Sequence, residues 1–288
     1  MLWKVKSFLL FIIVEFICCI FPECYSILSF SSPMNADYYS DPVLLEVVNS
    51  EFTVEKNEIE QLAKEVEIES ERPVININYI LGFSHILPTE DSETRGKILI
   101  DKKEGIPTTF LNRRVILRGR PGPDDPNERK KYIKNYMKEN IRKTIYKEYF
   151  SLLIYNIEKI DSYNYKLNLT IKANEKIENC FLRNTKVLIF LVVSEVKSEV
   201  SSSLVHKNVA YKFIPVEGFE NEEFDGTGNP LYKIINRNTI YEGDEIEIKS
   251  TEFNIDKSIN NTWNIVVIIE NNKRREILLT RKLRLNDN

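Results

Sequence analysis

Glu104-Gly105-Ile106-Pro107-Thr108-Thr109-Phe110 joins a charged, helix-compatible segment to a β-rich run that ends near Leu117. A Gly-Ile-Pro-Thr sequence at the entry to a strand suits a sharp backbone turn, and the proline biases Ile106 toward an extended conformation. The Ile106-Pro107 bond is a candidate for the cis isomer, which usually marks a tight turn. The motif is weak by itself, so its meaning depends on the elements on either side of it.

Strands and helices alternate around this motif. Short apolar or alternating runs predict strands at residues 42–48 and 74–80, and a strand pair within 108–117 that turns at 112–114. Helical spacing of apolar residues predicts helices over 54–66, 93–103 and 127–148, the last capped by Asn127. Alternation of this kind indicates an α/β domain with a central sheet.

The element order, with Gly105 to Phe110 at the proline position, resembles a thioredoxin fold. In that family the helix after the first long strand opens with Cys-x-x-Cys, and a cis-proline before a later strand faces it. Here Ser50-Glu51-Phe52-Thr53 stands at the motif position, so both cysteines are absent. The resemblance covers about residues 40–148 and implies a thioredoxin-like domain that is redox-inactive.

The missing cysteines decide the expected chemistry. Thiol–disulfide exchange needs a thiolate to attack and a second thiol to resolve the mixed disulfide. A serine hydroxyl does neither near neutral pH without an activating base, so we expect no enzyme activity here. A retained groove could still bind an extended peptide by strand addition. Its candidate residues are Ser50, Glu51, Phe52, Thr53, Ile106, Pro107 and Thr108; the alternative is that Ser50 and Thr53 serve only as helix caps.

The pattern changes to strands after Phe150. Seven short strands with Asn, Gly and Asp turns are predicted at 152–157, 163–171, 187–193, 208–216, 245–249, 263–270 and 276–283. Such a series is typical of an all-β, immunoglobulin-like sandwich, although the Cys…Trp…Cys pattern of antibody domains is absent. We therefore expect a thioredoxin-like domain over 42–148 followed by a β-sandwich domain over 150–288.

Two further runs extend the resemblance. His206-Lys207-Asn208-Val209-Ala210-Tyr211 and the run from Trp263 to Asn272 resemble the tail of the outer-membrane-protein-28-related family of bacterial envelope proteins. This resemblance implies an envelope location more than a mechanism.

Residues 1–26 are predicted to form a secretory signal peptide, because Lys4 and Lys6 precede an apolar run and small residues lie near Ser26. Residues 27–41 show no periodic pattern and are predicted to form a tether. We expect an exported protein of the periplasm, outer membrane or cell surface. Retention of the leader as an anchor, and lipidation of a leader cysteine, are the alternatives; the leader cysteines are Cys18, Cys19 and Cys24.

Few residues offer metal or redox chemistry. Cleavage would leave Cys180 as the one cysteine of the mature chain, and we expect it to be a small buried hydrophobe. His85 and His206 have no neighbouring ligand in sequence, so a metal or catalytic role is the lesser interpretation of each. The carboxylates of the loop 217–229 fit no EF-hand spacing, and a solvated turn is expected there. No cofactor is predicted.

Charge is divided along the first half of the chain. Residues 46–71 hold nine Glu and two Lys, whereas residues 113–147 hold twelve basic and four acidic residues. In a thioredoxin fold the first and last helices lie on the same side of the sheet, so we expect the acidic and basic helices to pair. Peripheral association of Lys134, Lys138 and Arg142 with an anionic membrane surface is the alternative.

Three functions follow from these patterns. The first is a non-enzymatic envelope protein that binds a protein or peptide partner or assists assembly. The second is an enzyme related to thiol oxidoreductases that uses Cys180. The third is a surface adhesin that acts through the sandwich loops. The net charge of −3 gives no general attraction to nucleic acid, and no phosphate-binding loop is present.

Overall fold

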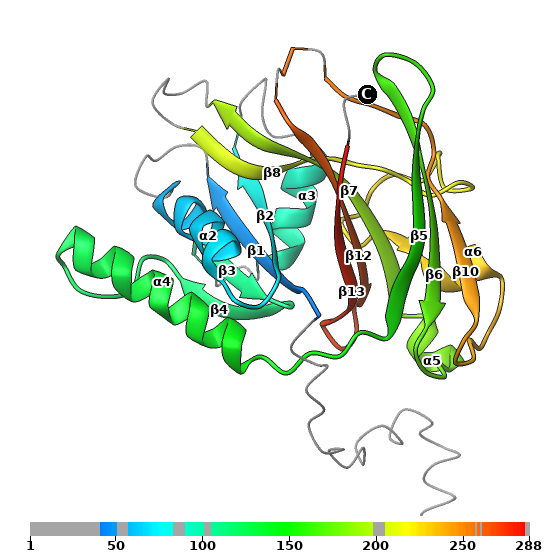
Figure 1. Ribbon diagram of the computed structural model, residues 1–288, viewed down its shortest axis with the longest axis horizontal. Coiled ribbons are helices and arrows are strands. Elements are labelled where there is room, and N and C mark those ends of the chain that lie inside the picture. Colours follow the sequence, from blue (N-terminus) through cyan, green and yellow to red (C-terminus); the bar gives the residue numbers. More distant parts are fainter. Residues whose placement is uncertain are drawn as a thin grey trace, which may run out of the picture. The chain divides into compact units, whose positions relative to one another are not determined.

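The structure, a computed structural model, describes residues 41–50, 57–82, 90–100, 105–197, 205–256, 258–259 and 261–285. The fold is mixed α/β with a large β-rich part (Figure 1). The elements of the first half of the chain are β1 (Val43–Ser50), α2 (Asn57–Glu69), β2 (Val74–Leu81), α3 (Glu90–Leu99), β3 (Thr108–Leu111), β4 (Arg114–Arg118) and α4 (Pro126–Lys143).

The second half is mostly strands. Its elements are β5 (Phe150–Lys159), β6 (Asn164–Ala173), α5 (Asn179–Leu182), β7 (Thr185–Lys197), β8 (Val205–Phe213), β9 (Asn229–Pro230), α6 (Leu231–Ile235), β10 (Glu245–Lys249), β11 (Phe253–Asn254), β12 (Trp263–Asn271) and β13 (Glu276–Arg284). The short elements α5, α6, β9 and β11 have no counterpart among the sequence predictions.

One sheet runs through both halves of the chain. Its strand order is β13-β12-β7-β8-β2-β1-β3-β4, and β9 pairs with β7. The strands β1 and β2 are parallel, whereas β3 is antiparallel to β1 and forms a hairpin with β4. The two halves join where β2 meets β8 in parallel at the single pair Asn78–Val209. The predicted division at residues 148–150 stays a prediction, because backbone pairing continues across it.

A second sheet of four strands faces the β7–β12 end of the first. In it β6 pairs with β5, β10 and β11. The strands β7 and β12 are buried on both faces, because their odd- and even-numbered residues enter different cores. Val187, Ile189 and Leu191 enter the core against the four-stranded sheet, whereas Leu188 and Phe190 enter the core shared with β1, β2 and the helices. Side chains of a strand point alternately to its two faces, so one strand serves two cores.

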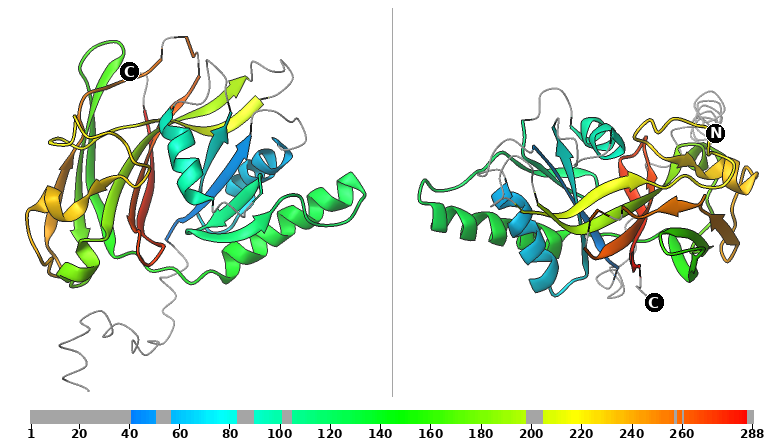
Figure 2. Two further views of the ribbon diagram at one scale, coloured as in Figure 1. Left: turned by 180° about the vertical axis from the view of Figure 1, so that it is seen from behind. Right: turned by 90° about the horizontal axis from the view of Figure 1, so that it is seen from above.

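The helices cover the first half of the sheet on two sides. Figure 2 shows α2 and α4 on one face of β1 and β2 and α3 on the other. Apolar residues of α2 and α4 fill the core at helical spacing: Ile59, Leu62, Ala63, Val66, Ile133, Met137 and Ile141. None of the helices in the described residues is long and apolar enough to cross a membrane.

The expected pairing of the acidic and basic helices is confirmed. Lys134 Nζ lies 2.7 Å from a carboxylate oxygen of Glu65 and 2.5 Å from one of Glu69, and Lys138 Nζ lies 2.7 Å from Glu69. Arg120 also pairs with Glu58, at 2.9 Å. The basic residues of α4 therefore compensate the acidic residues of α2 locally.

The ends of α4 differ from the prediction. Its N-cap is Asp125, whose carboxylate accepts from the backbone N–H groups of Asn127 and Glu128, because Pro126 takes the first helical position. The helix ends at Lys143 instead of residue 148. The segment after it is extended, which lets the side chain of Tyr146 enter the core.

Candidate functional site

The predicted groove lies where β1 ends and β3 begins. Val48 pairs with Thr108, so Ser50 and Ile106 lie at the same end of neighbouring antiparallel strands. The Ile106–Pro107 peptide is cis, as the sequence indicated. The strand register thus brings Ser50 and Ile106 to one corner of the sheet.

The side chains at this corner face inward. Thr108 is fully buried, and its hydroxyl donates to the carbonyl of Gly105 at 2.5 Å. Ser50 is buried and is the last residue of β1, paired with Leu81 of β2, so it is a strand residue. Glu51, Phe52 and Thr53 lie outside the described residues. The groove and the alternative of a helix cap at Thr53 both stay predictions.

A buried histidine lies beside the same end of β1. His206 Nδ1 is 3.0 Å and 3.2 Å from the two carboxylate oxygens of Glu60, and Asn49 Nδ2 donates to Glu60 at 2.5 Å. All three side chains are buried. His206 has a carboxylate partner from α2, which its sequence neighbours could not reveal, and it cannot meet a ligand from solvent. His85 lies outside the described residues.

A buried ionic cluster fixes α3 between the two halves of the molecule. Arg95 donates to both carboxylate oxygens of Glu270 at 2.9 and 2.7 Å, and its Nη2 is 3.3 Å from Glu46. Arg113 Nε lies 3.4 Å from Glu270, and the OH of Tyr79 donates to Glu46 at 3.2 Å. Since Glu46 is on β1 and Glu270 on β12, the sheet curls around α3.

The charges in this cluster stabilise one another. Burial alone would lower the pKa of Arg95, but Glu270 and Glu46 outweigh it and raise that pKa well above its ordinary value. Burial alone would raise the pKa of Glu270, but Arg95 and Arg113 hold it below the usual range. Arg95 and Glu270 are thus charged in the folded protein, and their pairing holds the middle of α3 in place.

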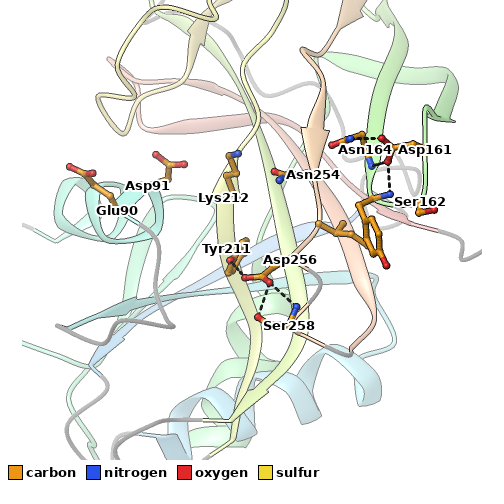
Figure 3. Close-up of a pocket in the computed structure, with 12 residues that line it drawn as sticks. Glu90, Asp91, Asp161, Ser162, Asn164, Tyr211, Lys212, Asn254, Asp256 and Ser258 are labelled. Carbon is orange, nitrogen blue, oxygen red and sulfur yellow. Dashed lines mark hydrogen bonds between the residues drawn. The ribbon is translucent and has the colours of Figure 1, made fainter.

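The first turn of α3, at Glu90 and Asp91, forms one wall of an open cavity of about 1020 Å³ (Figure 3). Figure 3 shows Glu90 and Asp91 of α3 on one side, the β5–β6 turn on the other, and Lys212 of β8 between them. The residues that line the cavity are Glu90, Asp91, Asp161, Ser162, Tyr163, Asn164, Tyr211, Lys212, Asn254, Ile255, Asp256 and Ser258. They come from four separate parts of the chain.

Hydrogen bonds hold the walls of this cavity together. Asp91 accepts from the backbone N–H of Phe213 at 3.0 Å, which ties α3 to β8. The OH of Tyr211 donates to Asp256 at 2.7 Å, which ties β8 to the loop after β11. The N–H of Ile255 donates to the carbonyl of Tyr163 at 3.0 Å. The cavity is therefore formed before any ligand arrives, which lowers the entropic cost of binding.

The carboxylates of the cavity differ in their surroundings. Burial raises the pKa of Asp91. Hydrogen bonds from Ser258 and Tyr211 lower the pKa of Asp256. Four carboxylates and one ammonium group line the space, so its charge is negative at neutral pH. Such a site attracts a cationic or polar ligand.

Cys180 lies away from the corner at Ser50 and Pro107 and from the cavity. It is exposed on α5, which packs at the end of the four-stranded sheet, and the prediction of a buried cysteine was wrong (Figure 1). The carbonyl of Cys180 accepts from Asn184, and its neighbour Phe181 stacks on Tyr149. Because Phe181 takes the inward position of this single turn, Cys180 points outward.

The acidic loop at residues 217–229 is shaped by its own backbone. Glu220 accepts from the N–H of Gly218 and Asp225 from the N–H of Thr227. The carbonyl of Gly226 accepts from Arg95 at 3.1 Å, which joins this loop to the buried cluster. Among the described residues no group of three or more His, Cys, Asp or Glu side chains could hold a metal ion.

Comparison with known proteins gives a fold relationship only. No protein-family profile and no curated protein sequence matches the chain. Among solved structures, HBP35 of Porphyromonas gingivalis superposes with a TM-score of 0.55 at 14% identity, over 86% of this chain and 76% of HBP35. The chain therefore shares a fold with HBP35.

Two weaker structural matches complete the comparison. A protein of Agrobacterium tumefaciens matches with a TM-score of 0.43 at 10% identity, over 85% of this chain and 95% of that one. A domain of the outer membrane lipoprotein Omp28 of P. gingivalis matches with a TM-score of 0.26 at 11% identity, over 48% of this chain and 89% of that domain. Scores this low carry no conclusion about the fold of this chain.

Proposed function

We propose that this chain is an exported, non-catalytic binding protein of the cell envelope, built from a redox-inactive thioredoxin-like unit and an immunoglobulin-like sandwich. The strand order β2-β1-β3-β4, with two parallel and then two antiparallel neighbours, supports the thioredoxin-like assignment. The two facing sheets of the second half support the sandwich.

The observation that carries the binding function is the preformed cavity of about 1020 Å³ between the two halves. Its volume lies at the upper end of the range typical of ligand sites. The side chains of Lys212, Asn254 and Glu90 line this space and place an ammonium, an amide and a carboxylate group at its wall, where a ligand can meet them. The negative lining favours a peptide segment of a partner protein that carries Lys or Arg.

The position of Cys180 argues against the thiol enzyme. A thiol that is exposed on α5 cannot act at the corner formed by Ser50 and Pro107, because that corner belongs to β1 and β3. We expect no turnover in an insulin-reduction assay, for the wild-type chain and for Cys180→Ser alike. Turnover that disappears in Cys180→Ser would restore the enzyme hypothesis.

Peptide binding can be measured directly at the cavity. Fluorescence anisotropy with a labelled Lys-rich hexapeptide and a matched Glu-rich hexapeptide should show binding of the first only, weakening as salt screens the charges. The double variant Glu90→Gln/Asp91→Asn should weaken binding several-fold, since the amides keep the hydrogen-bonding shape and remove the charge. The control Glu247→Gln removes a carboxylate from the distant strand β10. Equal binding of both peptides would contradict the proposal.

The groove at Ser50 and Pro107 is the second candidate site, because the strand register places Ser50 and Ile106 at one corner. A photo-crosslinking residue at position 254 or at position 106 distinguishes the two sites. Capture of the Lys-rich peptide from position 254 supports the cavity, whereas capture only from position 106 transfers the function to the groove. Intact-mass measurement of the exported protein tests cleavage of the leader and reports any lipid.

A further inference from the structure

The strand β5 forms one edge of the four-stranded sheet. It pairs with β6 on one side and, among the described residues, with no strand on the other. An open edge presents unpaired N–H and C=O groups, and proteins usually blunt it with charges, prolines or short length. β5 is ten residues long, and from Phe150 to Ile157 it has neither a charge nor a proline.

The same region concentrates exposed apolar surface. Eleven large hydrophobic side chains are exposed in the described part of the chain, and five of them lie within residues 153–163. They are Leu153, Ile154, Tyr155, Ile160 and Tyr163, with exposed fractions of 43%, 65%, 50%, 44% and 38%. A gathering of exposed large apolar side chains in one short stretch of chain is typical of interaction sites.

The sequence of β5 is compatible with antiparallel pairing to the β5 strand of a second copy. The ladder with β6 shifts register between Leu152 and Ile154 and is regular from Ile154 to Lys159. A two-fold axis at Ile157 pairs residues 155–159 with their copies in antiparallel order, because residues that face each other across such a pair carry side chains on the same face. Tyr155 then faces Lys159 and Asn156 faces Glu158, so no like charges lie opposite each other.

The exposed area also matches what such a pairing requires. At about 200 Å² for a fully exposed side chain of this size, the five side chains expose roughly 500 Å² per copy. Two copies together therefore offer up to about 1,000 Å² for burial, which is the lower bound for a specific interface. In an isologous contact one patch covers its own copy, so no second surface is needed.

We propose that two copies of this chain associate through antiparallel pairing of β5 with β5, which extends the four-stranded sheet across a two-fold axis. This goes beyond the proposed binding function, because the lining of the cavity contributes no residue of the five-residue ladder. The β5–β6 turn lines the cavity, so each dimer would carry two cavities next to the interface.

Sedimentation equilibrium of the full exported chain between 1 and 100 µM tests the proposal. We expect a concentration-dependent dimer, and Ile154→Lys should raise its dissociation constant at least tenfold by placing a charge in the apolar strip. Tyr241→Lys is the matched control, because Tyr241 is 60% exposed and lies between α6 and β10. A monomer at 100 µM, or a dimer that Ile154→Lys leaves unchanged, would overturn the proposal.

Hydrogen exchange gives a readout that needs no variant. The outward amides among residues 154–159 should exchange several-fold more slowly at 100 µM than at 1 µM, whereas the other amides of the chain should not change. Slow exchange that is independent of concentration would mean that the edge is covered within one chain, and the proposal would fail. A near-UV circular dichroism spectrum confirms that Ile154→Lys keeps its fold.

Discussion

Two sets of charges hold parts of this molecule together in opposite settings. The pairs between α2 and α4 lie on the surface, where Lys134 and Lys138 reach Glu65 and Glu69. The cluster around Arg95 is buried, with no exposed side-chain surface on Arg95, Glu46 or Glu270. Similar distances therefore predict very different energetic consequences, because water screens the first set and cannot screen the second.

The largest effect is expected from Arg95→Met. The methionine fills much of the same space but leaves the carboxylates of Glu46 and Glu270 buried without their main partner, which costs about 3–5 kcal/mol. Denaturant unfolding measures the loss. The matched control is Lys97→Met on the same helix, whose side chain is 65% exposed and which should change stability little. Equal effects of the two variants would mean that the cluster contributes no more than a surface pair.

Acidification should reverse part of that loss. In the wild type the folded pKa of Glu270 is lowered, so its stabilisation is present above the unfolded pKa of about 4.3 and is lost as the pH falls through the folded value. In Arg95→Met the carboxylates lose that partner and should protonate more readily. The difference in unfolding free energy between wild type and variant should therefore shrink from pH 7 to pH 4. A constant difference would contradict this account.

A smaller effect is expected from Lys134→Ala. It removes two pairs to Glu65 and Glu69, yet the loss should be roughly a fifth or less of that for Arg95→Met, because exposed pairs contribute little. The remaining difference should vanish in 1 M salt, where charges are screened within about 3 Å. An effect that persists at high salt would show that the two helices are held by directional hydrogen bonds instead.

The smallest effect is expected from Cys180→Ser. The side chain is exposed, so the substitution should leave the unfolding midpoint unchanged. A measurable destabilisation would show that the thiol contributes to packing on α5. Labelling of the native protein with a thiol reagent should be fast for the same reason.

Much of the fold follows from local sequence pattern. The alternation in Val74–Leu81 and Glu245–Lys249 predicts those strands to within a residue or two, because burial on one or both faces imposes the pattern. The junction of β2 with β8 was not predictable. It rests on one backbone pair between residues distant in sequence, and no periodicity reports it. The sequence also could not predict that Phe181 faces inward and Cys180 outward. A helix of a single turn is too short to show a periodic pattern of apolar residues.

The candidate sites divide in the same way. Pro107 and its cis peptide were accessible because proline has a local conformational signature. The cavity was not, because Asp91, Lys212 and Asn254 become neighbours only after four segments fold together. Likewise Glu270 is one of many glutamates in the sequence, and only burial next to Arg95 distinguishes it.

The reach of Arg95 also bears on the order of folding. Its partner Glu270 lies 175 residues later in the chain, so the salt bridge closes a very long loop. Contacts of such separation form slowly. During synthesis β1, β2 and α3 emerge with Glu46 near Arg95 but without its bidentate partner Glu270, so the cluster is completed only when β12 arrives. A segment ending near residue 148 lacks Glu270 and is therefore expected to be less stable when expressed alone than the same residues within the full chain.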